Sequence, residues 1–184
     1  DDGAGGKVDA VVDVVVAAVN DAPVIDRVDV KGDEDGVVNV TVSASDVDGD
    51  SVAFALGREP KNGKATIDAK GNLTFSPNTN WHGSDAVVVV VKDGGTSTSL
   101  ALPITIDSVN DAPTVEAMVL NTKEEQSVSL PLTVRDVDGD QPTISIGKDG
   151  AKGKASVDAR GRVSYVPGKD ENGAVKFVVV VEGV

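Results

Sequence analysis

The sequence predicts an all-β fold made of tandem β-sandwich units. The chain has 184 residues, of which 36 are Val and 23 are Asp. Its turn-forming Gly and Asp residues separate short Val-rich runs, and blocks of sequence recur at a fixed offset of 90 residues. Because β-branched side chains favour strands, whereas Asp and Gly favour turns over helix interiors, the composition argues against a helical bundle.

A repeat organises the chain. Aligning residues 20–94 with residues 110–184 gives 24 identities in 75 positions without a gap. The recurring blocks are VNDAP at 19–23 and 109–113, DVDGD at 46–50 and 136–140, and GKATIDAKG at 63–71 with GKASVDARG at 153–161. The sequence therefore predicts a tandem array with a unit of about 90 residues.

The repeat boundaries divide the chain into three parts. Residues 20–109 form a complete repeat, and residues 110–184 form a second repeat without a counterpart of the last strand, TSTSLALPITIDSV. Residues 1–19 end in the same VNDAP junction, so we expect them to be the last strand of a preceding repeat. We expect a soluble fragment of a longer protein.

Strands are expected wherever Val-rich or alternating runs lie between turn residues, at the spacing of about 8–12 residues that is typical of a sandwich. In the complete repeat these runs are 24–30, 37–44, 51–56, 64–67, 72–75, 86–91 and 99–106. The continuous run Val87 to Val91 favours a strand that is buried on both faces. The second repeat should contain the first six of these strands.

The charge and the residue inventory exclude several function classes. A formal net charge of -13 with 3% aromatic residues does not suit nucleic acid. With no Cys and a single His, His82, the chain cannot assemble a thiolate metal site, an imidazole cluster or a Ser/His/Asp or Cys/His catalytic set, so we expect no enzyme. The longest apolar runs are far shorter than the ~18 residues that span a bilayer, so no membrane insertion is expected.

Each repeat carries three Asp residues at alternate positions of one loop. These are Asp46, Asp48 and Asp50 in the first repeat, and Asp136, Asp138 and Asp140 in the second. Such carboxylates repel one another unless a cation lies between them, and Ca²⁺ takes about 6–8 oxygen ligands. The alternative, a solvated Asp-Gly turn, is disfavoured by recurrence in both repeats. An EF-hand is excluded because its twelfth position, which needs Glu, is Gly57 or Gly147.

VNDAP, the Glu34-Asp35-Gly36 turn, DVDGD, the NGKATIDAKGNLTFSPN hairpin, the WHGSD turn and KDGG together resemble a known group. They are similar to the cadherin-like repeats, of the VNDAP or tandem-95 type, in giant calcium-dependent bacterial surface adhesins of the RTX type. VNDAP also resembles the DxNDNAP linker of cadherins. The resemblance implies immunoglobulin/cadherin-like Greek-key sandwiches with about seven strands per unit, on a secreted or cell-surface bacterial protein.

The resemblance also implies a calcium site at each junction between repeats, with neighbouring repeats of the same protein as partners. At the junction within this chain the implied donors are Glu34, Asp85, Asp107, Asn110, Asp111, Asp136, Asp138 and Asp140. At the start of the first complete repeat they are Asn20, Asp21, Asp46, Asp48, Asp50 and Asp93, while Glu124 repeats Glu34 for a third repeat. Ala17 replaces the expected acid at the first junction, which should therefore bind calcium more weakly.

These features predict structural extender repeats of a bacterial adhesin that calcium rigidifies at the junctions. One alternative is a sandwich that binds glycan or protein, although Phe75, Trp81 and Tyr165 are better explained as core residues. Another is an extracellular filament subunit, in which residues 8–19 of one copy complete the second repeat of another by strand exchange.

Overall fold

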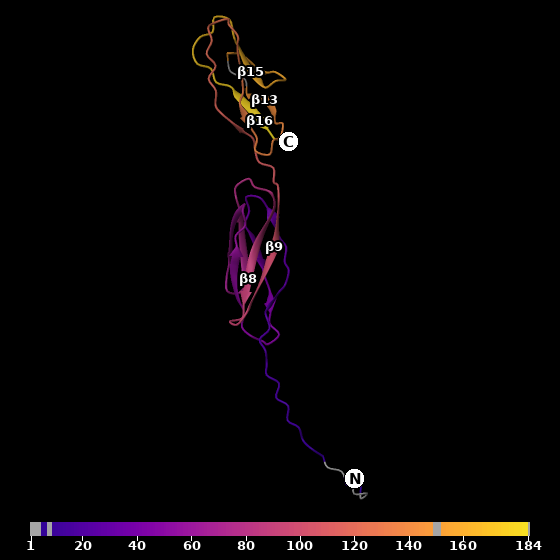
Figure 1. Cartoon of the computed structure of the whole chain (residues 1–184). Helices are drawn as coiled ribbons and strands as arrows, with labels where there is room; N and C mark the ends of the chain where they lie inside the picture. Colours follow the sequence, from indigo (N-terminus) through magenta and orange to yellow (C-terminus); the bar gives the residue numbers. More distant parts are fainter. Residues whose placement is uncertain (1–4, 7–8, 149–151, 184) are drawn as a thin grey trace. The chain divides into compact units, whose positions relative to one another are not determined.

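The computed structural model describes residues 5–6, 9–148 and 152–183, and the chain divides into two compact units, Asp1–Asp107 and Ser108–Val184 (Figure 1). We call them unit 1 and unit 2. All regular structure in the described residues is β, which confirms the predicted all-β class.

Unit 1 is a sandwich of two main sheets with a short strand pair beside them. The larger sheet has the order β2 (Val30–Asp33), β9 (Ser97–Asp107), β8 (Gly83–Lys92) and β5 (Ala53–Arg58). The smaller sheet has the order β3 (Val38–Thr41), β7 (Asn72–Pro77) and β6 (Gly63–Ile67), and β1 (Val24–Ile25) pairs with β4 (Ala44–Ser45). Every pairing is antiparallel except that of β2 with β9.

The core of unit 1 lies between the inner faces of the two sheets. Phe75 and Leu73 of β7 face Leu102 and Ile104 of β9 across a single buried cluster, and Trp81 packs against its edge. Along β9 the buried side chains stand on alternate positions, as expected for a strand with one solvated face. Phe75 is thus a core residue, as expected, whereas Trp81 is partly buried and packs against the core.

Strand β8 corrects one sequence-based expectation. Val87, Val89 and Val91 are 0% exposed, but Val88 and Val90 between them are only half-buried. The run is therefore not buried on both faces. A two-layer sandwich covers only the inner face of a central strand, and the outer Val side chains are sheltered only by their neighbours on the same sheet.

Two expected strands are each divided in the structure. Residues 24–30 become β1 and the start of β2, while 37–44 become β3 and the start of β4. The reason is a change of partner, since β1 pairs with β4 whereas β2 pairs with β9 and β3 with β7. Hydrophobic patterning reports which face of a segment is buried, not which edge it pairs with.

Unit 2 repeats most of this arrangement with the same registers. Its sheets are β10 (Thr114–Val115) with β12 (Val134–Arg135), β11 (Val128–Pro131) with β15 (Arg162–Pro167) and β14 (Gly153–Val157), and β13 (Thr143–Lys148) with β16 (Val178–Glu182). Its buried apolar residues in the described part of the unit are Ala155, Val163 and Tyr165, and the Tyr165 ring stacks on Phe177 with 5.8 Å between centroids.

One sheet of unit 2 is narrower than its counterpart. Within the described residues β16 pairs only with β13, and no strand forms between Val115 and Val128. In unit 1 the corresponding segment is β2, which pairs in parallel with β9. A β2-type strand has no ladder to join without a β9-type neighbour.

Candidate functional site

The DVDGD loop of unit 1 follows β4, and the side chain of its first residue, Asp46, accepts hydrogen bonds from the backbone of the residues after it. Asp46 Oδ1 accepts hydrogen bonds from the backbone N–H groups of Asp48 (2.9 Å) and Asp50 (3.3 Å). Gly49 adopts a φ of 81°, a left-handed conformation that glycine takes without a Cβ clash. The loop is therefore a tight turn that the Asp46 side chain holds together.

The same turn recurs in unit 2. Asp136 Oδ1 accepts from the N–H groups of Asp138 (3.0 Å) and Asp140 (3.3 Å), and Gly139 has a φ of 80°. The sequence repeat therefore encodes one loop geometry twice.

The second oxygen of the leading carboxylate distinguishes this loop from a simple solvated turn. Asp46 Oδ2 and Asp136 Oδ2 are both buried and have no hydrogen-bond partner. Buried polar atoms are normally paired, and an unpaired carboxylate oxygen costs free energy. A hard cation is a natural partner for such an oxygen, so the residues present fit the calcium that the resemblance implies.

Each VNDAP segment is tied to the Asp loop of its own unit. The Asp21 N–H donates to Asp48 Oδ2 over 2.8 Å, and the Asp111 N–H donates to Asp138 Oδ2 over 2.7 Å. The Asn side chains of the two segments make the same hydrogen bond. Asn20 Nδ2 donates to the Asp21 carbonyl, and Asn110 Nδ2 donates to the Asp111 carbonyl. The structure thus brings the linker and loop residues predicted for each site together.

Asp93 lies in the turn between β8 and β9. It is connected to the DVDGD loop of unit 1 only indirectly, through a hydrogen bond from the linker residue Asn20. It accepts hydrogen bonds from the Thr96 N–H (2.6 Å), the Thr96 hydroxyl (2.7 Å), the Gly95 N–H (2.7 Å) and Asn20 Nδ2 (3.0 Å). The Thr96 and Asn20 donors hold the pKa of this carboxyl well below its ordinary value. Asp93 therefore stays ionised and anchors Asn20.

Glu34 lies at the other end of unit 1, beyond β2. It is only 4% exposed, and its N–H donates to the carbonyl of Asp107 over 3.0 Å. His82 Nδ1 lies 3.6 Å from Glu34 Oε2. In unit 2 the equivalent pair is Glu124 and Asn172, whose amide donates over 3.4 Å. Sequence reasoning missed this contact, although position 82 repeats as a polar residue at 172.

Asp85 is hydrogen-bonded within unit 1. Its Oδ2 accepts from the N–H groups of Lys61 (2.7 Å) and Asn62 (2.8 Å) and from Asn62 Nδ2 (3.2 Å). Burial raises the pKa of Asp85, but hydrogen bonds from Ala86, Asn62 and Lys61 outweigh it, and the net shift is downward. The carboxylate therefore fastens the turn between β5 and β6.

The acidic side chains do not complete a coordination shell by themselves. Among residues 5–6, 9–148 and 152–183, no three Asp, Glu or His side chains are grouped closely enough to hold a metal ion. The oxygens of Asp46 and Asp136 would have to be joined by carbonyl, amide or water oxygens, which Ca²⁺ accepts readily.

Among residues 5–6, 9–148 and 152–183, no helix has the length and hydropathy needed to cross a membrane.

A comparison with protein families matches this chain to the family described as bacterial Ig domain, over residues 20–105 and again over 110–182. A comparison with curated proteins finds no significant match.

Solved structures share the fold at low identity. Human protocadherin-24 EC1-2 is 14% identical with a TM-score of 0.56, covering 89% of this chain and 94% of that one. Drosophila N-cadherin EC1-4 is 15% identical with a TM-score of 0.54, covering 88% of this chain and 48% of that one. An endo-fucoidan hydrolase from glycoside hydrolase family 107 is 18% identical, but this chain spans only 27% of it and the TM-score is 0.43. The predicted immunoglobulin/cadherin-like sandwich fold is confirmed.

Proposed function

The chain belongs to the bacterial Ig domain family, and on that basis we propose that it is a structural extender segment of a secreted or cell-surface bacterial adhesin whose repeats bind Ca²⁺ at their DVDGD loops. Repeats of this kind are typically extracellular. The observation that carries the calcium proposal is the pair of buried, unpartnered oxygens, Asp46 Oδ2 and Asp136 Oδ2, at equivalent positions.

The residues that would hold the ion are the acids of the loop and its linker, which would have to move together around it, since no three acidic side chains of the described residues are grouped closely enough as they stand. In unit 1 these are Asp46, Asp48 and Asp50 with Asn20 and Asp21, and in unit 2 they are Asp136, Asp138 and Asp140 with Asn110 and Asp111. A divalent cation would offset the repulsion among carboxylates crowded into one loop. The RTX adhesin type is a prediction that rests on the sequence resemblance.

The proposal that Ca²⁺ makes the linker rigid is supported by the hydrogen bonds that attach the linker to the DVDGD loop. The linker N–H of Asp21 or Asp111 is already bonded to an acid of the loop, Asp48 or Asp138. An ion bound to both loop and linker would restrict the torsions of VNDAP, whose Pro23 or Pro113 already has a fixed φ.

The test is a calcium titration of the intact chain. Thermal unfolding is measured in excess chelator and in rising Ca²⁺, with the affinity obtained by calorimetric titration. Ligand linkage predicts about 2.7 kcal/mol of added stability per site at a hundredfold excess over the Kd. Equal melting temperatures in chelator and in millimolar Ca²⁺ would contradict the proposal. Small-angle scattering in both conditions tests the rigidity, and an unchanged distribution of dimensions would rule it out.

A further inference from the structure

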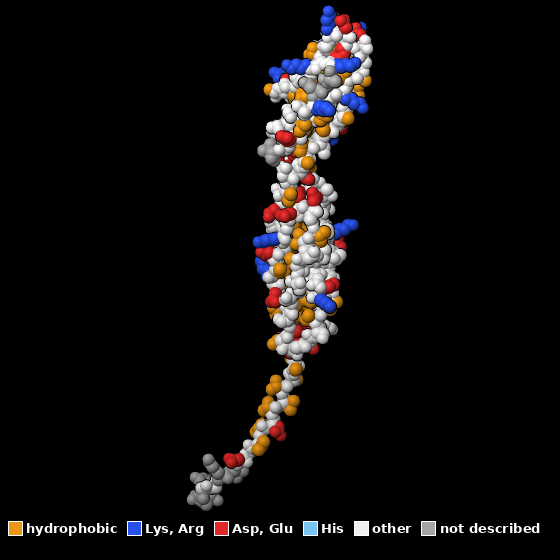
Figure 2. Space-filling view, turned by 180° about the vertical axis from the view of Figure 1, so that it is seen from behind, with side chains coloured by type: hydrophobic (Ala, Val, Ile, Leu, Met, Phe, Trp, Pro, Cys, Tyr) orange, Lys and Arg blue, Asp and Glu red, His pale blue; other side chains and the backbone are white. Residues whose placement is uncertain are grey.

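The β14–β15 hairpin of unit 2 is strongly cationic, although the whole chain has a net charge of -13. Residues 151–169 contain one acid, Asp158, and five cations, namely Lys152, Lys154, Arg160, Arg162 and Lys169. The equivalent residues of unit 1, 61–79, contain one acid and three cations. Lys and Arg side chains gather over unit 2, in the upper part of Figure 2.

Two of these cations lie on the outer face of the β11–β15–β14 sheet. Val163 and Tyr165 of β15 are buried, and so is Ala155 of β14. Because side chains alternate along a strand, Arg162 of β15 and Lys154 of β14 lie on the opposite, solvent-facing side. This side of the sheet is therefore charged.

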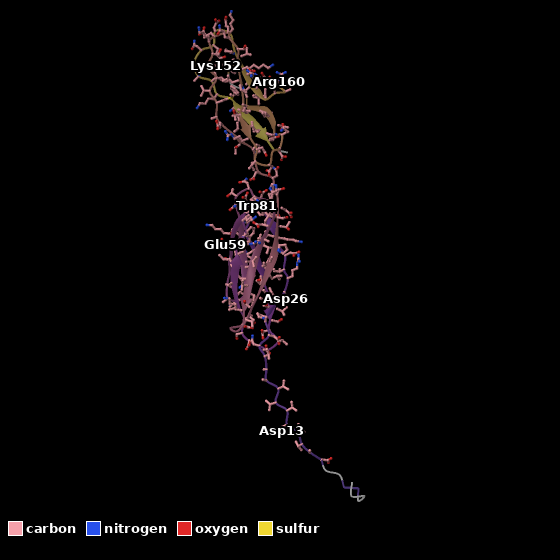
Figure 3. All side chains as sticks on the ribbon, viewed as in Figure 1. Asp13, Asp26, Glu59, Trp81, Lys152 and Arg160 are labelled. Carbon is pink, nitrogen blue, oxygen red and sulfur yellow. The ribbon has the colours of Figure 1, made fainter. Side chains whose placement is uncertain are left out.

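Two more cations flank β14. Lys152 precedes the strand and Arg160 lies in the turn that follows it, so the two lie at opposite ends of the hairpin, and both are exposed (Figure 3). The nearby Asp158 is used within the turn, where its Oδ1 accepts the N–H groups of Arg160 (2.8 Å) and Arg162 (2.9 Å). The ion pairs among the described residues lie in unit 1, so none of these cations is paired with a carboxylate there.

A row of hydroxyls crosses the same face. Ser129 of β11, Ser164 of β15 and Ser156 of β14 lie opposite one another, and Ser164 Oγ donates to Ser129 Oγ over 2.9 Å. Arg162 Nη2 donates to the Ser129 carbonyl over 3.1 Å. This bond holds the guanidinium against the sheet, so less side-chain entropy is lost when its other N–H groups bind a ligand.

Unit 1 has the same face with less charge. Its sheet of β3, β7 and β6 pairs in the same registers, shifted by 90 residues. Asn62 and Asn72 stand where unit 2 has Lys152 and Arg162. The three strands therefore form one scaffold in both units, and the added cations distinguish unit 2.

We propose that the outer face of the β11–β15–β14 sheet binds an anionic polysaccharide, a function beyond that of a structural extender. Lys154, Arg160 and Arg162 pair with the carboxylate or sulfate groups of the polysaccharide, and the Ser row forms hydrogen bonds with its hydroxyls.

The face favours a polysaccharide over other anions. Strands β14 and β15 have 5 and 6 residues, so the face extends over roughly 16–20 Å at about 3.3 Å per residue, which suits an extended chain better than a small ion. Tyr165 is directed to the core, and no aromatic ring among the described residues of the sheet lies on this face, so nucleic-acid bases have nothing on which to stack. The hydroxyl row complements the hydroxyls that an acidic peptide lacks.

The first experiment titrates the 184-residue chain with alginate, which carries carboxylates, and with dextran sulfate, in excess chelator at low salt. Lys154→Gln with Arg160→Gln should weaken binding about five- to tenfold, because two cation–anion contacts are lost. The matched control, Lys64→Gln with Lys70→Gln, removes the same charge at the equivalent positions of unit 1 and should change the affinity by no more than about twofold. All four side chains are exposed, and circular dichroism checks the folding.

The second experiment replaces Arg162 by the residue of unit 1. Arg162→Asn should weaken binding of both polyanions about fivefold, and Arg162→Lys, which keeps the charge without the planar fork, should lie in between. Thermal unfolding is measured alongside, because both variants change the bond to the Ser129 carbonyl. Neutral dextran should not bind, and polyglutamate and phosphatidylserine vesicles should bind at least about tenfold more weakly than the better polysaccharide.

Three results would overturn the proposal. They are a parent chain that binds neither alginate nor dextran sulfate at low salt, unit 1 and unit 2 double variants that lose equal affinity, and polyglutamate or vesicles that bind as tightly as the polysaccharides. Because chelator is present throughout, none of these results depends on calcium, so the extender proposal is tested separately.

Discussion

Asp46 and Asp136 stand 90 residues apart in the sequence and in the same place of their two units. In each, Oδ1 accepts two backbone N–H groups of its own loop while Oδ2 is buried without a partner. A chance imperfection of packing would not recur at both positions. The pair lies where the proposed Ca²⁺ would bind, so substitutions are most informative there.

Replacing these carboxylates by amides should weaken calcium binding. Asp46→Asn and Asp136→Asn keep the side-chain shape and one acceptor oxygen but remove the charge, so we expect the Ca²⁺ affinity of the affected loop to fall about tenfold or more. Calorimetric titration measures this. Asp68→Asn is the matched control, because both Asp68 oxygens are already hydrogen-bonded to Lys70 and Asn72. An equal loss of affinity in the control would argue against the site.

The acid sensitivity of unit 1 should depend on Asp93. Its folded-state pKa is lowered from the ordinary value of 3.8 by Thr96 and Asn20, so the unfolded chain takes up the proton first as the pH falls. The stabilisation is present above that ordinary value and is lost progressively below it. Asp93→Asn should be less stable at neutral pH and should lose less stability between about pH 5 and pH 2. Urea unfolding at several pH values measures this, and an unchanged pH profile would contradict the role of Asp93. Thr96→Ala, which removes one donor, should behave in between.

Truncation on the inner face of β9 should be costly. Leu102 is 0% exposed, and Leu102→Ala should lower the free energy of unfolding by about 2–5 kcal/mol. Thr105→Ala, on the exposed face of the same strand, should change it by no more than about 0.5 kcal/mol. Urea denaturation compares the two, and similar effects would mean that β9 does not bury the face described.

The glycine of the DVDGD loop should resist replacement for conformational reasons alone. At Gly49 a Cβ would meet no atom within 4 Å, but the φ of 81° strains any L residue. Gly49→Ala should therefore cost about 1–2 kcal/mol, and Gly49→Asn less. Gly6→Ala, where φ is not left-handed and no atom lies within 4 Å, should be neutral in thermal unfolding. A neutral Gly49→Ala would show that the turn relaxes freely.

Local sequence was sufficient to determine the repeat, the all-β class and the position of each Asp loop. Val-rich alternation and Asp-Gly turns act over a few residues, and the DVDGD turn is closed by hydrogen bonds that span four residues at most. The repetition of the loop in the sequence therefore predicted the repetition of its geometry. The burial of Phe75 and Tyr165 was predictable for the same reason.

Only the tertiary structure decided the features that depend on which segments lie across from one another. The division of residues 24–30 between β1 and β2, the one-sided burial of β8 and the pairing of His82 with Glu34 all depend on distant partners. The sequence made Asp85 a ligand candidate, and only the fold shows that its Oδ2 also accepts hydrogen bonds from Asn62. Strand pairing and burial are properties of the sheet as a whole, because a residue's hydrogen bonds and exposure are set by neighbours that its own stretch of sequence does not name.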